Sequence, residues 1–187
     1  MDTGTIPPVH NLTKLTIFLG LTLSSLMQLP GISGTLPRDL PSSLSVLAFI
    51  GESISGTVPD SFSKPMVLLS LYTEWSSGFI SGTMPGTWYS TDQLRSIVFV
   101  NSELSGTIGS LDYLSNLESL MLYNGALFGS QRYAGHVSGS IPPLDNALNL
   151  SYLAMNVNAI SGSSPVALLS LPKLQVLWLC QTPCSGV

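Results

Sequence analysis

Along this 187-residue chain, apolar residues recur with the spacing apolar-x-x-apolar-x-apolar, and this pattern occurs seven times. Its last three positions alternate with period two, which is typical of a short strand with one buried face. The copies are Leu12/Leu15/Ile17, Leu44/Leu47/Phe49, Met66/Leu69/Leu71, Leu94/Ile97/Phe99, Leu117/Leu120/Leu122, Leu150/Leu153/Met155 and Leu174/Leu177/Leu179. We therefore expect seven short strands, with the middle residue of each triplet in one inward-pointing row.

A second phrase, built around a Ser-Gly step, separates these copies. It reads ISGTLP from Ile32, ISGTVP from Ile54, ISGTMP from Ile80, LSGTIG from Leu104, VSGSIP from Val137 and ISGSSP from Ile160, with its glycines 22 to 33 residues apart. Self-similarity at this period predicts a solenoid of stacked turns. Gly permits a sharp corner and Pro ends any helix, so the return segments should be 3-10 or irregular chain. Strands of successive turns should stack in parallel about 4.8 Å apart.

The combined unit LxxLxLxxxxISGTxP resembles the plant-type leucine-rich repeat, which is found in receptor-kinase ectodomains and in inhibitors of pectin-degrading enzymes. The SGT-x-P form, with Trp88 shortly after Pro85, is also similar to repeats of trypanosomatid surface antigens. The resemblance implies a β-rich α/β solenoid, coiled as a right-handed superhelix. Its parallel sheet would line the concave face and 3-10 or irregular chain the convex side. It also implies non-catalytic recognition of proteins, peptides or glycans.

One column departs from this family pattern. The residue three positions after the last strand leucine is usually Asn, whose side chain bonds the backbone of neighbouring turns, and here only Asn158 keeps that type. Repeat sequence also reaches both ends of the chain. We therefore expect a single solenoid domain over residues 1–187, a segment of a longer array whose uncapped ends could contact a neighbouring chain.

Composition excludes several functions. Only 9% of the residues are charged, against roughly 25% in typical soluble domains. The six basic residues are scattered, so nucleic acid is not an expected partner. The uncharged stretch 15–37 is interrupted by polar residues, Gly and Pro, so no transmembrane helix is expected. Cys180 and Cys184 have no metal-binding spacing, and no metal or other cofactor is expected.

Two Asn-x-Ser/Thr sequons, at Asn11 and Asn149, would accept glycans if the chain is secreted. The Thr of the SGT phrase forms a further column of hydroxyl groups, which would bond the backbone at the turn.

Residues between the inward positions should face outward on the concave sheet. Neither of the two outward columns contains a charge, and an uncharged strip that carries aromatic residues is typical of an interface. Strand propensity alone would also select such residues. The candidate partner-binding residues of this face are Phe18, Ile50, Tyr72, Val98, Val100, Met121, Tyr123 and Trp178.

Three turns are longer than the others, and the added residues fall just after the strand, at 21–31, 75–79 and 126–136. Insertions in solenoids commonly map to one face, often the binding face, although neutral drift in loops would give the same lengths. The candidate residues of this insert edge are Trp75, Phe79, Phe128, Arg132 and Tyr133.

Glu52 and Glu74 occupy one column in consecutive turns and could form an acid/base pair or recruit a cation. No His or nucleophile motif accompanies them in the repeat frame, so two solvated carboxylates are expected and the chain is not expected to be an enzyme. The sequence predicts a recognition module at the cell surface or outside the cell. The alternative is a structural component that contacts neighbours through its uncapped ends.

Overall fold

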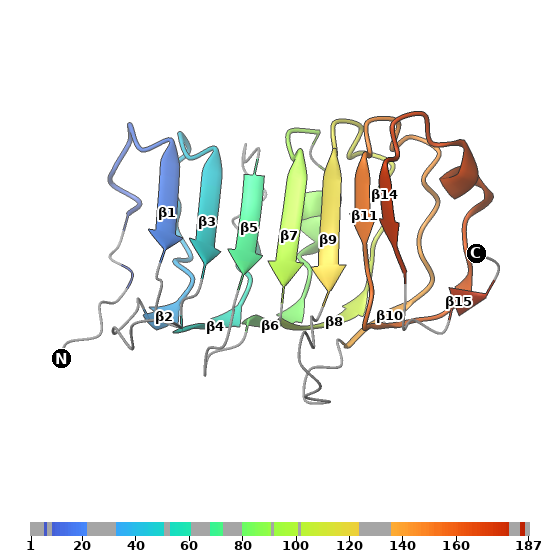
Figure 1. Ribbon diagram of the computed structural model, residues 1–187. Coiled ribbons are helices and arrows are strands. Elements are labelled where there is room, and N and C mark those ends of the chain that lie inside the picture. The colour runs from blue at the N-terminus through green and yellow to red at the C-terminus, as the bar shows by residue number, and fades with distance from the viewer. Residues whose placement is uncertain are drawn as a thin grey trace.

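The computed structural model describes residues 6, 9–21, 33–50, 53–60, 68–72, 80–90, 92–100, 102–123, 136–179 and 184–185. One strand from each repeat enters a seven-stranded parallel sheet, whose strands stand side by side in chain order (Figure 1). The strands are β1 (Ile17–Leu21), β3 (Val46–Ile50), β5 (Leu68–Tyr72), β7 (Ser96–Val100), β9 (Ser119–Tyr123), β11 (Tyr152–Ala154) and β14 (Val176–Trp178). The predicted β-rich solenoid is confirmed; the handedness of its coil stays a prediction.

The predicted inward row is present from the second turn onward. The register aligns six residues, one from each strand after β1: Leu47, Leu69, Ile97, Leu120, Leu153 and Leu177. Within this row Leu47, Ile97, Leu120 and Leu153 are at most 1% exposed, and Leu177 packs against the same core. Burying one large aliphatic side chain is worth roughly 1.5–3 kcal/mol, so each fully buried residue of this row stabilises the sheet by about that amount.

The first turn has a different register from the one predicted. Phe18, not Leu15, aligns with Leu47, and Gly20 aligns with Phe49. Phe18 therefore points into the core, where its ring meets that of Phe49 edge to face at a centroid distance of 5.3 Å. The true triplet of this turn is Leu15/Phe18/Gly20. Because glycine stands at its third apolar position, the pattern search selected a triplet three residues too early, and Leu12 of that triplet is 51% exposed.

The Ser-Gly phrases form a second sheet, which the sequence analysis did not predict. Its six parallel strands are β2 (Ser33–Thr35), β4 (Ser53–Thr57), β6 (Ile80–Thr83), β8 (Glu103–Thr107), β10 (His136–Gly139) and β12 (Ala159–Ile160). A separate pair, β13 (Gly162–Ser163) and β15 (Cys184–Ser185), continues this arrangement. In Figure 1 the labelled strands β2 to β10 follow the lower edge of the molecule.

The side chains of the phrase explain why it is repeated. Gly106 has φ +83°, a left-handed conformation that disfavours side chains, and a Cβ added there would lie 2.9 Å from Cγ2 of Thr83 in the preceding turn. The Ser105 hydroxyl donates to the Gly82 carbonyl, also in the preceding turn, at 3.2 Å. Thus Gly supplies the corner, the Thr methyl packs over the next glycine, and Ser joins the turns. The expectation that the Thr hydroxyl makes the backbone contact finds no support in the described contacts.

Short 3-10 helices lie on the return side, as predicted: η2 (Gly86–Ser90) and η3 (Val166–Ser170). Trp88 of η2 is fully buried and stacks on Phe99 at a centroid distance of 5.8 Å. Its neighbour Tyr89 crosses to the next turn, where its Cε2 lies 2.5 Å from the place of a Cβ on Gly109. The phrase LSGTIG therefore has Gly where other turns have Pro because the Tyr89 ring occupies that space.

Asn158 makes the contacts expected of its column. It is buried, and its Nδ2 donates to the carbonyl of Met155 at 3.2 Å and to the carbonyl of Leu122 in the preceding turn. The adjacent Val157 is the one described residue other than glycine with a positive φ, at 59°. A β-branched residue is disfavoured in that conformation, so this corner carries backbone strain.

Candidate functional site

Two rows of residues cover the outer side of the seven-stranded sheet, and together we call them the strand face. The first row holds Ile17, Val46, Leu68, Ser96, Ser119, Tyr152 and Val176. The second holds Leu19, Ala48, Ser70, Val98, Met121, Ala154 and Trp178. No position in either row is charged. The predicted uncharged face therefore exists, although in the first turn its members differ from those predicted.

Three predicted residues take their expected places on this face. Val98 and Met121 are half-buried, and Trp178 is 47% exposed. The prediction for Phe18 is wrong because the register turns its side chain into the core. Ile17 and Leu19 take the outward places of that turn, with 53% and 50% of their surfaces exposed.

The remaining predicted residues divide into three groups. Val100 is only 2% exposed, so its predicted exposure is wrong; the register places its backbone between those of residues 72 and 123. The backbone of Ile50, Tyr72 and Tyr123 lies in the same outward row as Val100. Outside the described residues lie all five insert-edge candidates and both stacked carboxylates: Trp75, Phe79, Phe128, Arg132, Tyr133, Glu52 and Glu74.

An aromatic pair occupies the last turns of the strand face. The rings of Tyr152 on β11 and Trp178 on β14 meet edge to face, with centroids 5.9 Å apart. Ala154, the ladder partner of Trp178, is fully buried, and its small side chain leaves room for these rings. The sequence analysis missed Tyr152 because it considered only the columns that directly follow the inward residues, and Tyr152 precedes one. Its position two residues before Ala154, on the same face of the strand, was the available signal.

A polar row crosses the beginning of the same strands. Arg95, Glu118, Ser151 and Gln175 share one register, and the backbone N–H groups of the last three each donate to the carbonyl of the turn before, at 2.7–2.9 Å. Arg95 Nη1 and Glu118 Oε1 lie 2.6 Å apart, and each side chain is about half exposed, at 53% and 51%. Exposed ion pairs contribute about 0–1 kcal/mol, so this pair neutralises charge more than it stabilises the fold.

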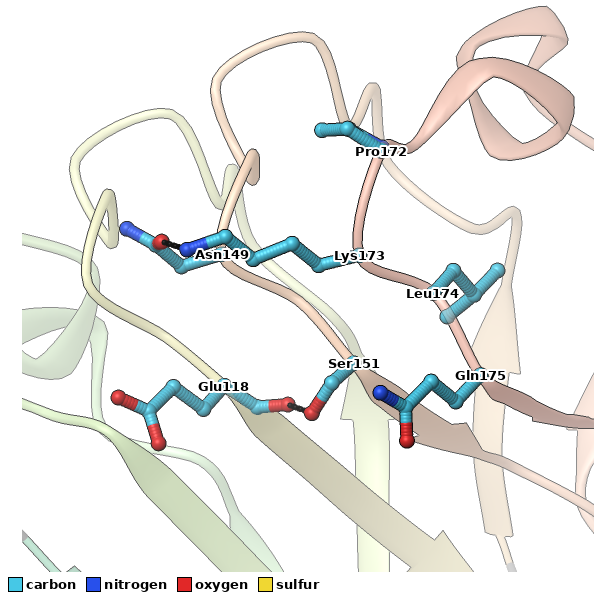
Figure 2. A pocket seen from close by; sticks show the side chains of 7 residues that line it. All are labelled: Glu118, Asn149, Ser151, Pro172, Lys173, Leu174 and Gln175. Carbon is cyan, nitrogen blue, oxygen red and sulfur yellow. Dashed lines mark hydrogen bonds between the residues drawn. The ribbon is translucent and has the colours of Figure 1, made fainter.

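A cleft of about 410 Å³ opens beside this polar row, shown in Figure 2. It is lined by Glu118, Asn149, Ser151, Pro172, Lys173, Leu174 and Gln175. Lys173 extends across it, and its ammonium donates to Asn149 Oδ1 at 2.6 Å. The Ser151 hydroxyl donates to the Glu118 carbonyl at 3.0 Å. Most of the lining side chains are polar, and they come from three successive turns.

Asn149, one of the two predicted glycan acceptors, has a structural role in this cleft. Its Nδ2 donates to the Ser115 carbonyl of the preceding turn at 2.8 Å, and Asn116 donates in the same way to the Asp92 carbonyl at 3.0 Å. Asparagines directly before the first leucine of an apolar triplet thus link neighbouring turns, which the sequence analysis did not foresee. The other acceptor, Asn11, is exposed.

The described residues contain neither a metal-binding cluster nor a membrane-spanning helix. Among them, no three His, Cys, Asp or Glu side chains gather closely enough to bind a metal ion. Within the same residues, no helix has the length and apolar character needed to cross a membrane.

Comparison with known proteins places the fold. No family model matches the sequence, and no curated protein matches it. The structure is similar to the Arabidopsis receptor kinase HAESA in complex with the peptide hormone IDA and the co-receptor SERK1, with 28% identity and a TM-score of 0.75 over 98% of this chain. It is also similar to PEPR1 in complex with AtPEP1, at 25% identity and a TM-score of 0.72. The plant peptide hormone receptor RGFR1, in complex with RGF2, is 25% identical over 82% of this chain, with a TM-score of 0.64.

This chain spans only part of those receptors. It covers 28% of the HAESA chain, 24% of the PEPR1 chain and 23% of the RGFR1 chain. What the comparisons establish for this chain is therefore its architecture.

Proposed function

We propose that this chain, a plant-type leucine-rich-repeat solenoid, is a non-catalytic recognition module that binds a peptide or an extended protein segment on its strand face. The observation that carries this proposal is the contrast between the two sides of one sheet. On the inner side of the seven-stranded sheet, Leu47, Leu120 and Leu153 are at most 1% exposed, whereas Trp178 on the outer side is 47% exposed. Exposed apolar residues on an uncharged surface are typical of an interface, and Trp is prominent among the residues that dominate binding energy.

The solved neighbours support the same conclusion. The HAESA structure contains the peptide hormone IDA, and RGFR1 is a plant peptide hormone receptor in complex with RGF2. We propose by analogy that this chain also binds a peptide, that it acts outside the cell or at its surface, and that it holds its ligand without transforming it. The described residues offer no metal-binding cluster from which a reaction could be built.

A second function, assembly with neighbouring chains, is favoured by one specific observation. Val166 and Leu169 of η3 are 87% and 86% exposed, more than any described apolar residue of the strand face. They belong to a single turn, however, whereas the strand face continues across seven strands. We therefore give the strand face priority and use the η3 residues as the matched control.

The test is selection from a displayed random-peptide library on the immobilised chain, followed by titration of the enriched peptides against two variants. Trp178→Ala should weaken binding by about 2 kcal/mol, roughly thirtyfold, because it removes a central aromatic anchor. Leu169→Ala, which removes a more exposed side chain from another surface, should leave binding unchanged.

Loss of binding in Leu169→Ala alone would move the interface to η3 and favour assembly. Failure to enrich any peptide over a blank support would reject peptide recognition.

A further inference from the structure

We propose that the ligand of the strand face carries an acidic group that is held by Lys173 in the cleft, about three extended residues away from an apolar or aromatic side chain seated on Trp178. This inference rests on the proposed function and specifies the chemistry of its ligand. The predicted partner is thus an extended peptide with an acidic and a large apolar residue at a fixed separation.

The charge of the cleft comes from Lys173. The other cation at this edge, Arg95, is matched by Glu118 at 2.6 Å, and this is the one salt bridge found among the described residues. Lys173 instead donates to the neutral amide oxygen of Asn149. Its positive charge is therefore uncompensated within the described part of the chain, and a bound carboxylate would supply the missing partner.

The cleft also offers free hydrogen-bond donors for such a carboxylate. An ammonium has three donors, and Lys173 uses one of them on Asn149. The side chain of Gln175, an exposed residue that lines the same cleft, makes no hydrogen bond through its amide to the described residues. Figure 2 shows the Lys173 ammonium at Asn149, so it must turn toward the Gln175 side chain for both to donate to one carboxylate. The Ser151 hydroxyl is already directed to the Glu118 carbonyl.

The separation of the two contacts follows from the strand itself. Gln175 stands directly before β14 (Val176–Trp178), so Trp178 lies three residues further along the extended chain. At about 3.3 Å per residue this distance is about 10 Å, which a second extended chain covers in the same number of residues. The edge-to-face contact with Tyr152 fixes the Trp178 ring and still leaves 47% of the residue exposed for an anchor.

The surface between the two contacts favours a peptide over a glycan. Apart from Tyr152, whose ring meets that of Trp178, the strand face around Trp178 holds Val176, Ala154 and Met121, and none of these three side chains can form a hydrogen bond with a sugar hydroxyl. A sugar stacked on Trp178 would leave hydroxyl groups unpaired against these residues, which is costly. An extended peptide avoids this cost because alternate side chains can point away from the sheet.

The experiment is an array of synthetic peptides in a Gly/Ser background, each with one Glu and one Trp at a defined separation, probed with the intact chain and two charge-reversal variants. Lys173→Glu changes the cleft. Lys14→Glu is the matched control. Lys14 directly precedes Leu15, the first residue of its apolar triplet, as Lys173 precedes Leu174, and both lysines are exposed, but Lys14 lies in the first turn, away from the cleft. Thermal melting checks that both variants fold.

The expected result is strongest binding at a separation of about three residues, weakened about three- to tenfold by Glu→Gln in the peptide, as for a partly exposed ion pair. Lys173→Glu should reverse the preference toward peptides with Lys in place of Glu, and Lys14→Glu should not. Equal effects of the two variants would overturn the proposal, because they would indicate long-range attraction only.

Two other outcomes would also overturn this inference, and they differ in what they leave standing. Binding that depends on Trp178 but not on the acidic residue would leave the proposed recognition function intact. Binding to a glycan array and to no peptide would contradict both.

Discussion

The two sheets of this solenoid obey different sequence rules. In the second sheet four of the six strands contain Ser-Gly-Thr and β10 ends on Ser-Gly, because the corner needs glycine at positive φ and both hydroxyl residues pack against neighbouring turns. In the seven-stranded sheet only the inward half is constant, and the outward positions range from Ala48 to Trp178. Where the backbone dictates a residue the repeat is conserved within the chain, so variable outward residues are the ones free to serve recognition.

The largest expected effect comes from the inward row of the seven-stranded sheet. Leu120→Ala should lower the free energy of unfolding by about 2–5 kcal/mol, because Leu120 is 1% exposed and its loss leaves a cavity. Met121→Ala, the next residue and on the strand face, should cost less than about 1 kcal/mol. Denaturant titration of both variants measures the difference. Equal losses would mean that the two sides of the sheet are not distinct.

The second effect tests the need for glycine in the Ser-Gly phrases of the second sheet. Gly106→Ala should destabilise by about 1–3 kcal/mol, since it combines a positive φ with a Cβ 2.9 Å from the Thr83 methyl. Gly34→Ala provides the control, because its φ is +123° but no atom lies within 4 Å of the added Cβ. Its cost should be smaller and due to the backbone alone. If Gly34→Ala cost as much as Gly106→Ala, packing of the Thr methyl would not matter.

A third effect concerns the one phrase that departs from the rule. Gly109→Ala should destabilise by about 1–3 kcal/mol because the Tyr89 ring lies 2.5 Å from the new Cβ. In the background of Tyr89→Ala the same substitution should cost much less. A double-mutant cycle of unfolding free energies gives the coupling between the two residues. If the changes in unfolding free energy of the two substitutions were additive, the Tyr89 ring would not be the reason that Gly109 stands where other turns have Pro.

The smallest effect lies at the corner that joins the two sheets, and it should be stabilising. Val157 has φ 59°, whereas the equivalent positions of other turns include Gly51, Asn101 and Asn124. Gly and Asn tolerate this conformation better than a β-branched residue. Val157→Asn should therefore raise the free energy of unfolding by about 1 kcal/mol. A lower value than in the unchanged protein would show that packing of the Val157 side chain outweighs its backbone strain.

The sequence was sufficient to predict the fold where the apolar triplets were complete. From the second turn onward, the predicted middle residues are aligned as expected. In the first turn Gly20 holds a position that a large apolar residue fills elsewhere, so periodicity alone gave the wrong register for Phe18. The second sheet escaped prediction because Ser-Gly-Thr has the composition of a turn, and only the pairing between turns makes it a strand.

The candidate site was less predictable than the fold. Trp178, Met121 and Val98 could be assigned to the outer side by alternation, but the contact of Tyr152 with Trp178 depends on which residues become diagonal neighbours. The cleft draws its lining from three turns, and none of its polar residues belongs to a motif on its own. Such a site can be recognised only once the register between turns is known.

Unfolding and binding measured together on Trp178→Ala test the central claim most directly, because that claim assigns stability to the inward residues and recognition to the outward ones. We predict an unfolding free energy within about 1 kcal/mol of the unchanged protein and a loss of peptide binding of about 2 kcal/mol. A variant that unfolds markedly more easily while binding its peptides as before would contradict the assignment.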